Sequence, residues 1–214
     1  MSEIPQIPVD EKLVRVLIDS AAIEHRVVQL ADRISSDYRG KTPLLVVGVL
    51  KGAFVFLADL CRRITIPHHV DFIALSSYGM EGTGSGAVRM VMDLKIDVQG
   101  RHMLVVEDIS DTGYTLDYLM RNFTARQPAS LRCCSLLSKP SLRKVDIKID
   151  YIGFEIPDVW VVGYGLDYRE TYRTLPYIAE YRIDDMGSGE WNVGKSKDEQ
   201  GIAGNSREER GRFR

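Results

Sequence analysis

The segment from Met103 to Leu116, MLVVEDISDTGYTL, constrains the fold more than any other part of the chain. An unbroken apolar run, 103–106, is followed by two acids, Glu107 and Asp108, and then by a short loop rich in hydroxyl groups. Such apolar runs are typical of strands that are covered on both faces in a parallel sheet. Because two unpaired charges are costly to bury, we expect both acids at the rim of the sheet. Ligands of open α/β sheets bind beyond the carboxyl ends of strands, so this segment predicts a site as well as a strand.

The loop at 111–115, Asp-Thr-Gly-Tyr-Thr, has the composition of an anion-binding turn. Glycine lets the backbone approach a ligand closely, and hydroxyls and successive amide N–H groups can surround an anion where a helix begins. In an alternative interpretation, Asp111 or Thr112 only caps the helix that follows and the two upstream acids are solvated. The loop is not a Walker motif, because no Gly-Lys-Ser or Gly-Lys-Thr follows at the required glycine spacing.

Predicted strands alternate with predicted helices along the chain. The first helix follows Asp19 or Ser20, either of which can cap it, and ends near Gly40. Its apolar face consists of four residues at helical spacing: Ile23, Val27, Leu30 and Ile34. Further helices are predicted at 53–62 and 114–126, and strands at 44–50, 70–78, 103–107, 131–137, 150–155, 160–163 and 177–183. The alternation predicts an α/β fold with right-handed crossovers and a mostly parallel sheet.

Composition excludes several classes of function. A chain of 214 residues is long enough for one domain with a sizeable core. Its formal net charge of −2 gives no bulk attraction to nucleic acid or to an anionic membrane. No apolar run approaches the ~20 residues of a membrane-spanning helix, and no signal-peptide pattern is present. We therefore expect a cytoplasmic protein with neither nucleic acid nor membrane as a partner.

The three cysteines predict reduced thiols rather than disulfides. Cys133 and Cys134 are adjacent in a predicted strand, where successive side chains point to opposite faces, and Cys61 has no nearby partner in the sequence. Residues 187–214 are dominated by Gly, Ser, Asn, Lys, Glu and Arg without apolar periodicity, so we expect a disordered tail after a domain at 1–186.

Five segments together resemble one family. Residues 103–116 are similar to the phosphoribosyl-pyrophosphate signature of type I phosphoribosyltransferases. Four further segments resemble the bacterial hypoxanthine-guanine phosphoribosyltransferases in order and spacing: VGVLKGAFVFLADL, VDFIALSSYG, LLSKPSLRKVDIKIDYIGFEIPD and VVGYGLDYRETYRTLPYI. The resemblance runs from about residue 10 to residue 183. It implies the type I phosphoribosyltransferase fold, a mostly parallel central sheet flanked by helices, with a small hood subdomain from N- and C-terminal segments.

The resemblance also implies a reaction of purine salvage. A ring nitrogen of hypoxanthine or guanine displaces pyrophosphate from C1 of phosphoribosyl pyrophosphate and gives IMP or GMP. Asp111 matches the catalytic proton acceptor beside the purine N7. Glu107 and Asp108 match acids that hold the ribose diol and Mg²⁺, and Asp167 matches an acid that supports a second magnesium. Relatives suggest a homodimer or a homotetramer.

The remaining implied roles concern substrate binding. The loop from Asp111 to Thr115, with Thr112, Gly113 and Tyr114 between them, matches the 5′-phosphate site, although many relatives have lysine where Tyr114 stands. Lys51 and Gly52 match the pyrophosphate loop, where the peptide is often non-trans in relatives, and Arg173 matches an arginine that reaches the pyrophosphate.

Purine recognition is assigned to the carboxyl half. Lys139 matches a donor to the exocyclic O6, Trp160 matches an aromatic ring stacked on the base, and the main chain of Val161 reads the base edge. Asp167 also lies at the amino end of this purine site. Taken without the family, Lys51-Gly52 is an ordinary turn, Arg173 is a surface ion pair, and Trp160 is a tryptophan of a core strand.

Two other functions compete with this one. The chain is either a purine-salvage enzyme or a regulator that keeps the fold, senses phosphoribosyl pyrophosphate and binds nucleic acid. The presence of Asp111, Lys139 and Arg173, and the lack of a helix-turn-helix or a basic field, favours the enzyme. A third interpretation keeps the enzyme but makes xanthine the base. The glycine-rich segment 79–86 resembles a lid that excludes water, with a flexible hairpin as the alternative.

Overall fold

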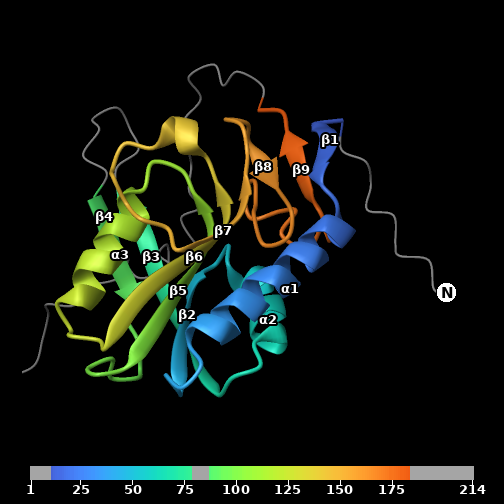
Figure 1. Ribbon diagram of the computed structural model, residues 1–214. Coiled ribbons are helices and arrows are strands. Elements are labelled where there is room, and N and C mark those ends of the chain that lie inside the picture. Colours follow the sequence, from blue (N-terminus) through green and yellow to red (C-terminus); the bar gives the residue numbers. More distant parts are fainter. Residues whose placement is uncertain (1–10, 79–86, 184–214) are drawn as a thin grey trace, which may run out of the picture. The chain divides into compact units, whose positions relative to one another are not determined.

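The computed structural model describes residues 11–78 and 87–183, and the elements below lie in a compact unit that ends at Arg182 (Figure 1). Our predictions for the segment 79–86 and for the tail 187–214 lie outside the described residues.

A six-stranded sheet forms the centre of this unit. Its strands lie in the order β4 (Ala87–Met92), β3 (His68–Tyr78), β2 (Leu44–Leu50), β5 (His102–Ser110), β6 (Ser130–Ser138) and β7 (Tyr151–Glu155). All neighbouring pairs are parallel except β3 and β4, which run antiparallel. The prediction of a mostly parallel sheet is therefore confirmed.

Helices cover both faces of this sheet, as the apolar strands require. Alternate side chains of a strand point to opposite faces. Leu44 and Val46 of β2 pack with the cluster that contains α1 (Ser20–Asp37) and α2 (Phe54–Arg63). Leu45 and Val47 pack with the cluster that contains α3 (Tyr114–Thr124). The same alternation separates the two adjacent cysteines: Cys133 lies in the α3 cluster and Cys134 in the other, and all three thiols are free.

The first helix forms as predicted. The carboxylate of Asp19 accepts a hydrogen bond from the backbone N–H of Ala22 at 2.8 Å and so caps the helix. The four predicted apolar residues, Ile23, Val27, Leu30 and Ile34, are all buried. The helix ends at Asp37, and Gly40 follows with a φ of 77°, a left-handed conformation that favours glycine.

A second, three-stranded sheet combines the two ends of the described chain, as a hood subdomain requires. Its order is β1 (Leu13–Ile18), β9 (Ile178–Tyr181), β8 (Val161–Val162), and both pairs are antiparallel. We did not predict β1, β4 or the short 3₁₀ helix η1 (Pro140–Leu142). β1 and β4 each lie at the edge of a sheet and expose apolar side chains; for example, Val16 is 51% exposed and Val91 is 66% exposed. Because apolar side chains are exposed on these strands as well as buried, neither strand produces the alternating pattern that marks a strand in a sequence.

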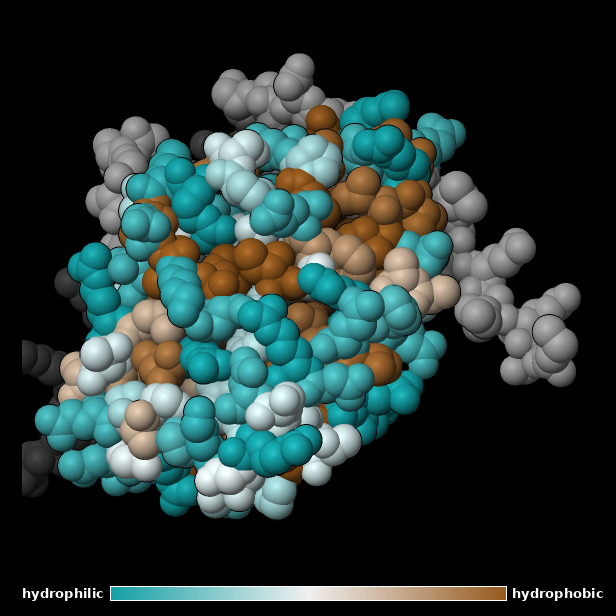
Figure 2. Space-filling model, viewed as in Figure 1, coloured by the Kyte–Doolittle hydropathy of each residue, from teal (hydrophilic) through white to brown (hydrophobic). Residues whose placement is uncertain are grey.

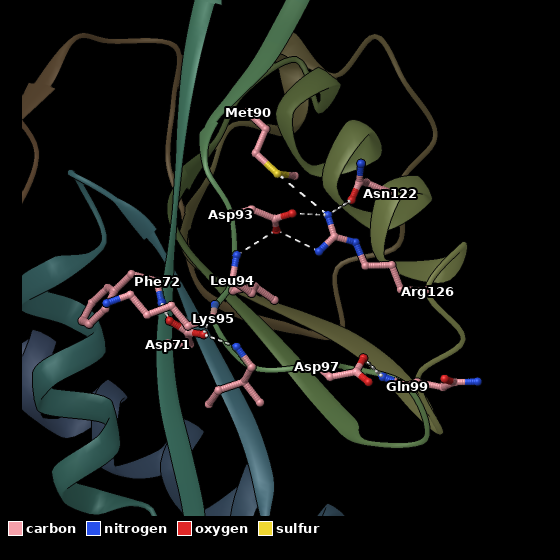
Figure 3. Close-up of polar contacts among 11 residues, drawn as sticks. Asp71, Phe72, Met90, Asp93, Leu94, Lys95, Asp97, Gln99, Asn122 and Arg126 are labelled. Carbon is pink, nitrogen blue, oxygen red and sulfur yellow. Dashed lines mark hydrogen bonds and ion pairs between the residues drawn. The ribbon is translucent and has the colours of Figure 1, made fainter.

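Two carboxylates fix the connection between β4 and β5 (Figure 3). Asp71 of β3 accepts hydrogen bonds from the backbone N–H groups of Lys95 and Ile96 at 2.9 and 3.1 Å. Asp93 accepts two from the guanidinium of Arg126, just beyond α3, at 2.8 and 2.9 Å. This bidentate pair ties the carboxyl end of α3 to the sheet edge and so helps to fix the direction in which the amino end of the helix points.

Polar side chains cover most of the face shown in Figure 2, and apolar side chains gather in a band across its middle and over the small sheet. None of the helices in the described ranges combines the length and the apolar character needed to cross a bilayer.

Candidate active site

The acids of β5 lie deeper than the sequence suggested. The strand continues past both of them to Ser110, and Glu107 is only 7% exposed. Burial raises the pKa of Glu107 well above its usual value, and the nearby charge of Asp108 raises it further. The expectation of a position at the rim is therefore wrong for Glu107. The group tolerates burial because it can be held neutral, which avoids the penalty for an unpaired buried charge.

Asp108 is the more readily ionised of the two acids. Burial raises its pKa to about 6, while the hydrogen bond from the backbone N–H of Ile109, at 2.9 Å, and the charge of Arg173 act in the opposite direction. Gly52 lies directly against this carboxylate, because a Cβ atom at Gly52 would overlap the Oδ2 of Asp108. The Lys51-Gly52 loop and the acids of β5 are thus brought together as predicted.

The turn before α3 has no side-chain cap. Its N-cap is Gly113, with a φ of 89°, and neither Asp111 nor Thr112 caps the helix. The alternative in which one of these residues serves only as a cap is therefore wrong. The carbonyl of Thr112 accepts from the backbone N–H groups of Lys144 and Val145 at 3.0 and 3.2 Å, which ties the turn to the segment after β6. Tyr114 and Thr115 form the first turn of α3, and the Tyr114 side chain is exposed.

Asp111 lies beside a buried lysine, Lys139. The Nζ of Lys139, a residue only 6% exposed, is 3.8 Å from the Oδ1 of Asp111 and 3.8 Å from the Oδ1 of Asp158. Burial raises the pKa of Asp111 and the charge of Asp158 raises it further, while Lys139 and Arg143 act to lower it. Sequence reasoning missed Asp158, whose only signal was its place at the end of the segment 136–158 that carried the resemblance.

Arg143 is a second residue that the sequence analysis missed. Its guanidinium donates to the hydroxyl of Ser110 at 2.6 Å and to that of Ser138 at 3.0 Å, so it bridges the carboxyl ends of β5 and β6. A Cβ atom at Gly113 would lie 3.2 Å from the Cδ of Arg143. The arginine therefore packs against the turn that precedes α3.

Lys51 and Arg173 are brought together through a third residue, Glu170. The Oε2 of Glu170 is 3.0 Å from the Nζ of Lys51 and 3.3 Å from an Nη of Arg173. Arg173 also pairs with Asp167 at 2.8 Å, so it is not an isolated surface arginine. The non-trans peptide bond of this region joins Leu50 to Lys51. Glu170 was not predicted, since a carboxylate between two cations has no signature in sequence.

The residues predicted to contact the purine base include two at the small sheet, Trp160 and Val161. Trp160 directly precedes β8 and is 48% exposed, so the interpretation as a tryptophan of a core strand is wrong. Its ring meets that of Tyr168 edge to face, with centroids 6.3 Å apart. Val161 is buried in β8, where it pairs with Glu180 of β9. An exposed aromatic face beside a strand backbone suits the stacking of a flat base.

Three buried polar atoms in the described part of the chain lack a hydrogen-bond partner, and all three belong to predicted site residues. They are Oε2 of Glu107, Oδ1 of Asp111 and Nε of Arg173. Asp108 interacts electrostatically with each of these residues. Since buried polar groups are nearly always paired in native proteins, three exceptions around one carboxylate indicate a ligand site.

The donor set fits a magnesium ion that is completed by substrate. Glu107 and Asp108 offer carboxylate oxygens, the ligands that Mg²⁺ prefers, and one of these oxygens is unpartnered. Within the described ranges no three His, Cys, Asp or Glu side chains gather as a complete ligand set. Both oxygens of Asp167 are engaged, one by Arg173 and one by the backbone N–H of Glu170 at 2.8 Å.

A cavity of about 640 Å³ lies beside this site rather than in it. Residues of α1 and α2 and of the segment 173–176 line it, and Arg173 is the one predicted site residue among them.

The fold is of the α/β class, and its candidate site lies around the carboxyl end of β5. Residues 17–169 match the phosphoribosyl transferase domain. The chain belongs to the phosphoribosyltransferase family, and its fold is the type I phosphoribosyltransferase fold.

Individual relatives and solved structures show which members of this family the chain resembles. The chain is 48% identical over 164 residues to the hypoxanthine-guanine phosphoribosyltransferase of Bacillus subtilis, covering 77% of this chain and 91% of that protein. It is 47% identical over 168 residues to the enzyme of the same name from Mycobacterium tuberculosis, covering 76% and 83%. Its structure resembles the hypoxanthine phosphoribosyl transferase of Trypanosoma cruzi, with a TM-score of 0.77, 43% identity and coverage of 81% and 93%.

Proposed function

We propose that this protein transfers the 5-phosphoribosyl group from phosphoribosyl pyrophosphate to hypoxanthine or guanine, giving IMP or GMP and pyrophosphate. One observation carries the assignment of the site: buried side-chain atoms of Glu107, Asp111 and Arg173 lack a hydrogen-bond partner, and all three residues interact electrostatically with Asp108. A sugar with two hydroxyls, a phosphate and a diphosphate offers partners to both acids and to the arginine.

The sugar donor is held by its two ends. Glu107 and Asp108 accept hydrogen bonds from the ribose hydroxyls, and the backbone from Asp111 to Thr115, with the hydroxyls of Thr112 and Thr115, binds the 5′-phosphate. The uncapped amino end of α3 favours an anion at this position. Glu107 and Asp108 would hold Mg²⁺, which would supply positive charge to offset that of the leaving diphosphate.

The leaving pyrophosphate is bound by the two cationic loops. Lys51 and the backbone at Gly52 approach from the end of β2, and Arg173 approaches from the loop after β8. The fork of an arginine matches phosphate oxygens, and Nε of Arg173 is buried without a partner. Asp167 holds this guanidinium in place and lies at the amino end of the purine site; a second magnesium shared with Asp167 stays a prediction.

The purine is bound and deprotonated on the other side of the sugar. Its ring stacks on Trp160, its edge contacts the main chain of Val161, and Lys139 donates to O6. Asp111 accepts the N7 proton as N9 attacks C1. Burial raises the basicity of this carboxylate, while the charge of Lys139 keeps it from becoming too weak an acid at neutral pH.

We also propose a cytoplasmic location and assembly as a homodimer or a homotetramer. Relatives named for hypoxanthine and guanine support the substrate assignment, but xanthine differs from them only at the 2-position. No described side chain is dedicated to that position, so xanthine stays open as a third base.

The test is a steady-state assay with phosphoribosyl pyrophosphate, Mg²⁺ and, in turn, hypoxanthine, guanine, xanthine and adenine. We expect turnover with hypoxanthine and guanine, little with adenine, and none after chelation of the metal. Absence of turnover with every base, together with binding of a DNA duplex, would support the regulator instead. Faster turnover with xanthine than with the other bases would correct the substrate.

A further inference from the structure

The carboxylate of Glu170 lies between the two cations assigned to pyrophosphate. It contacts Lys51 at 3.0 Å and Arg173 at 3.3 Å, and Lys51 and Glu170 are 119 residues apart in sequence. Hydrogen bonds from Lys51 and then from Arg173 lower the pKa of Glu170, so the carboxylate is ionised at neutral pH. An anion thus already binds both groups.

The loop that carries Glu170 is shaped to make this contact. Five non-glycine residues of the described chain have a positive φ, and three of them are Arg169, Glu170 and Tyr172. The backbone N–H of Glu170 donates to Asp167, whose other oxygen pairs with Arg173. This turn folds the Glu170 side chain back over the arginine. Non-glycine residues in the left-handed region are strained and tend to cluster at functional sites.

Another anion can replace Glu170 at this contact, because the Lys51 and Glu170 side chains are both exposed. The Lys51 and Glu170 side chains are 66% and 64% exposed, whereas the Arg173 side chain is 17% exposed and is also fixed by the carbonyl of Gly165 at 2.8 Å. Exposed ion pairs are weak. A diphosphate carries more charge than one carboxylate and has more acceptor oxygens, so it can displace Glu170 while Arg173 keeps its place.

We propose that Glu170 is an internal competitor of pyrophosphate. In the free enzyme its carboxylate occupies Lys51 and Arg173, and the diphosphate of the donor or free pyrophosphate displaces it. On release of the product the carboxylate returns, which weakens the binding of pyrophosphate and speeds its departure. The proposal rests on the proposed function, specifically on the assignment of Lys51 and Arg173 to the diphosphate.

The test measures the Kd of inorganic pyrophosphate, in the presence of Mg²⁺, for the full chain and for Glu170→Gln. Loss of the competing charge is expected to tighten binding about 3- to 10-fold and to lower the KM for phosphoribosyl pyrophosphate in parallel. Because the contact is exposed, the difference is expected to shrink as potassium chloride is raised from 50 mM to about 500 mM.

A matched control is Glu24→Gln. Glu24 is 69% exposed and pairs with Arg63 at 2.8 Å, so this substitution removes a carboxylate of similar exposure and the same charge from outside the loop. We expect it to leave the Kd of pyrophosphate within about twofold of the original. An equal effect of both variants would show a general charge effect and overturn the proposal.

The variants Lys51→Ala and Arg173→Gln separate this inference from the proposed function. If neither weakens pyrophosphate binding, the assignment of the two cations is wrong. If both weaken it and Glu170→Gln also weakens it or leaves it unchanged, Glu170 positions the cations or has no role, and the internal competitor is refuted while the proposed function stands.

Discussion

Two clusters of polar side chains lie at opposite ends of the central sheet, and they differ in how their polar atoms are paired. At the end where β6 and β7 begin, a carboxylate oxygen of Asp37 accepts from Arg132 and from the hydroxyl of Tyr151, both at 2.8 Å. At the other end, Glu107 and Asp111 each have a buried oxygen without a hydrogen-bond partner, and the nearest cation to that of Asp111, the Nζ of Lys139, is 3.8 Å away.

The pKa values of the acids follow the same division. The hydrogen bond from Tyr151 is the main cause that lowers the pKa of Asp37. Burial is the main cause that raises the pKa of Glu107, Asp108 and Asp111. The first cluster stabilises the folded chain, whereas the second is unfavourable until a ligand supplies the missing partners. We therefore assign Asp37, whose carboxylate has hydrogen-bond partners, to the stability of the fold. We assign Glu107, Asp108 and Asp111 to the binding of a ligand.

The largest expected effect comes from the unpaired cluster. Asp111→Asn removes the proton acceptor but keeps the shape of the side chain. We expect kcat to fall about 10²- to 10⁴-fold, with a much smaller change in the KM for phosphoribosyl pyrophosphate. Steady-state kinetics with hypoxanthine measures both. A control is Asp146→Asn, an exposed carboxylate of the same region. Equal losses in kcat and in donor binding would contradict the role as a base.

The next effect concerns the buried lysine of the same cluster. Lys139→Ala removes the donor to O6, and we expect the preference for hypoxanthine over adenine, as a ratio of kcat/KM values, to fall about 10- to 100-fold. Competition assays with the two bases measure this ratio. Lys144→Ala, an exposed lysine nearby, serves as control. Unchanged discrimination in Lys139→Ala would remove the lysine from base recognition.

A substitution in the unpaired cluster is also expected to stabilise the protein. The pKa of Asp108 is raised to about 6 from an ordinary value of 3.8. Folding stability is therefore lost as pH rises from about 4 through 6, because the unfolded chain ionises first. Asp108→Asn avoids this loss. We expect it to be more stable by on the order of 1–3 kcal/mol at pH 7.5, and by much less at pH 4.

Urea unfolding of the metal-free protein at the two pH values measures this difference. The m-value serves as the internal control, since an unchanged slope shows that the variant buries the same surface. A variant that is less stable at pH 7.5 would show that this carboxylate is paired in the folded chain.

The smallest expected effect lies in the paired cluster and has the opposite sign. Asp37 has a lowered pKa, so its contribution is present at neutral pH and is lost as pH falls below about 4. Because its side chain is 35% exposed, we expect Asp37→Asn to lose less than about 1 kcal/mol at pH 7.5. The same unfolding experiment tests it, with activity expected to stay near that of the original. Stabilisation at pH 7.5 would break the contrast between the two clusters.

The sequence predicted the interior of the fold better than its edges. The strand at 44–50 was predicted to the residue, because it is buried on both faces and has a continuous apolar pattern. β1 and β4 were missed, because edge strands with exposed valines have no such pattern. We predicted a strand at 103–107, whereas β5 continues to Ser110. The two charges were interpreted as the end of the strand, although Glu107 is buried within it.

The candidate site shows a similar limit. Residues such as Asp111, Lys139 and Arg173 were available from motifs, and in the structure Asp111 lies beside Lys139 and Arg173 pairs with Asp167. Asp158 and Glu170 were not available, because their importance depends on which cations they face across the fold. The pairing of Lys51 with Glu170, 119 residues apart, is a property of the tertiary structure alone.

The glycine at 165 has a consequence for the range of leaving groups. A Cβ atom there would overlap the carbonyl of Gly52, and one at Gly52 would overlap Asp108, so the two cationic loops meet main chain against main chain. Contacts between backbone atoms, rather than side-chain packing, thus set the distance between the loops that carry Lys51 and Arg173. Attempts to redesign the enzyme for donors with a longer or shorter polyphosphate will have to remodel whole loops, because point substitutions cannot move these two backbones apart by a chosen amount.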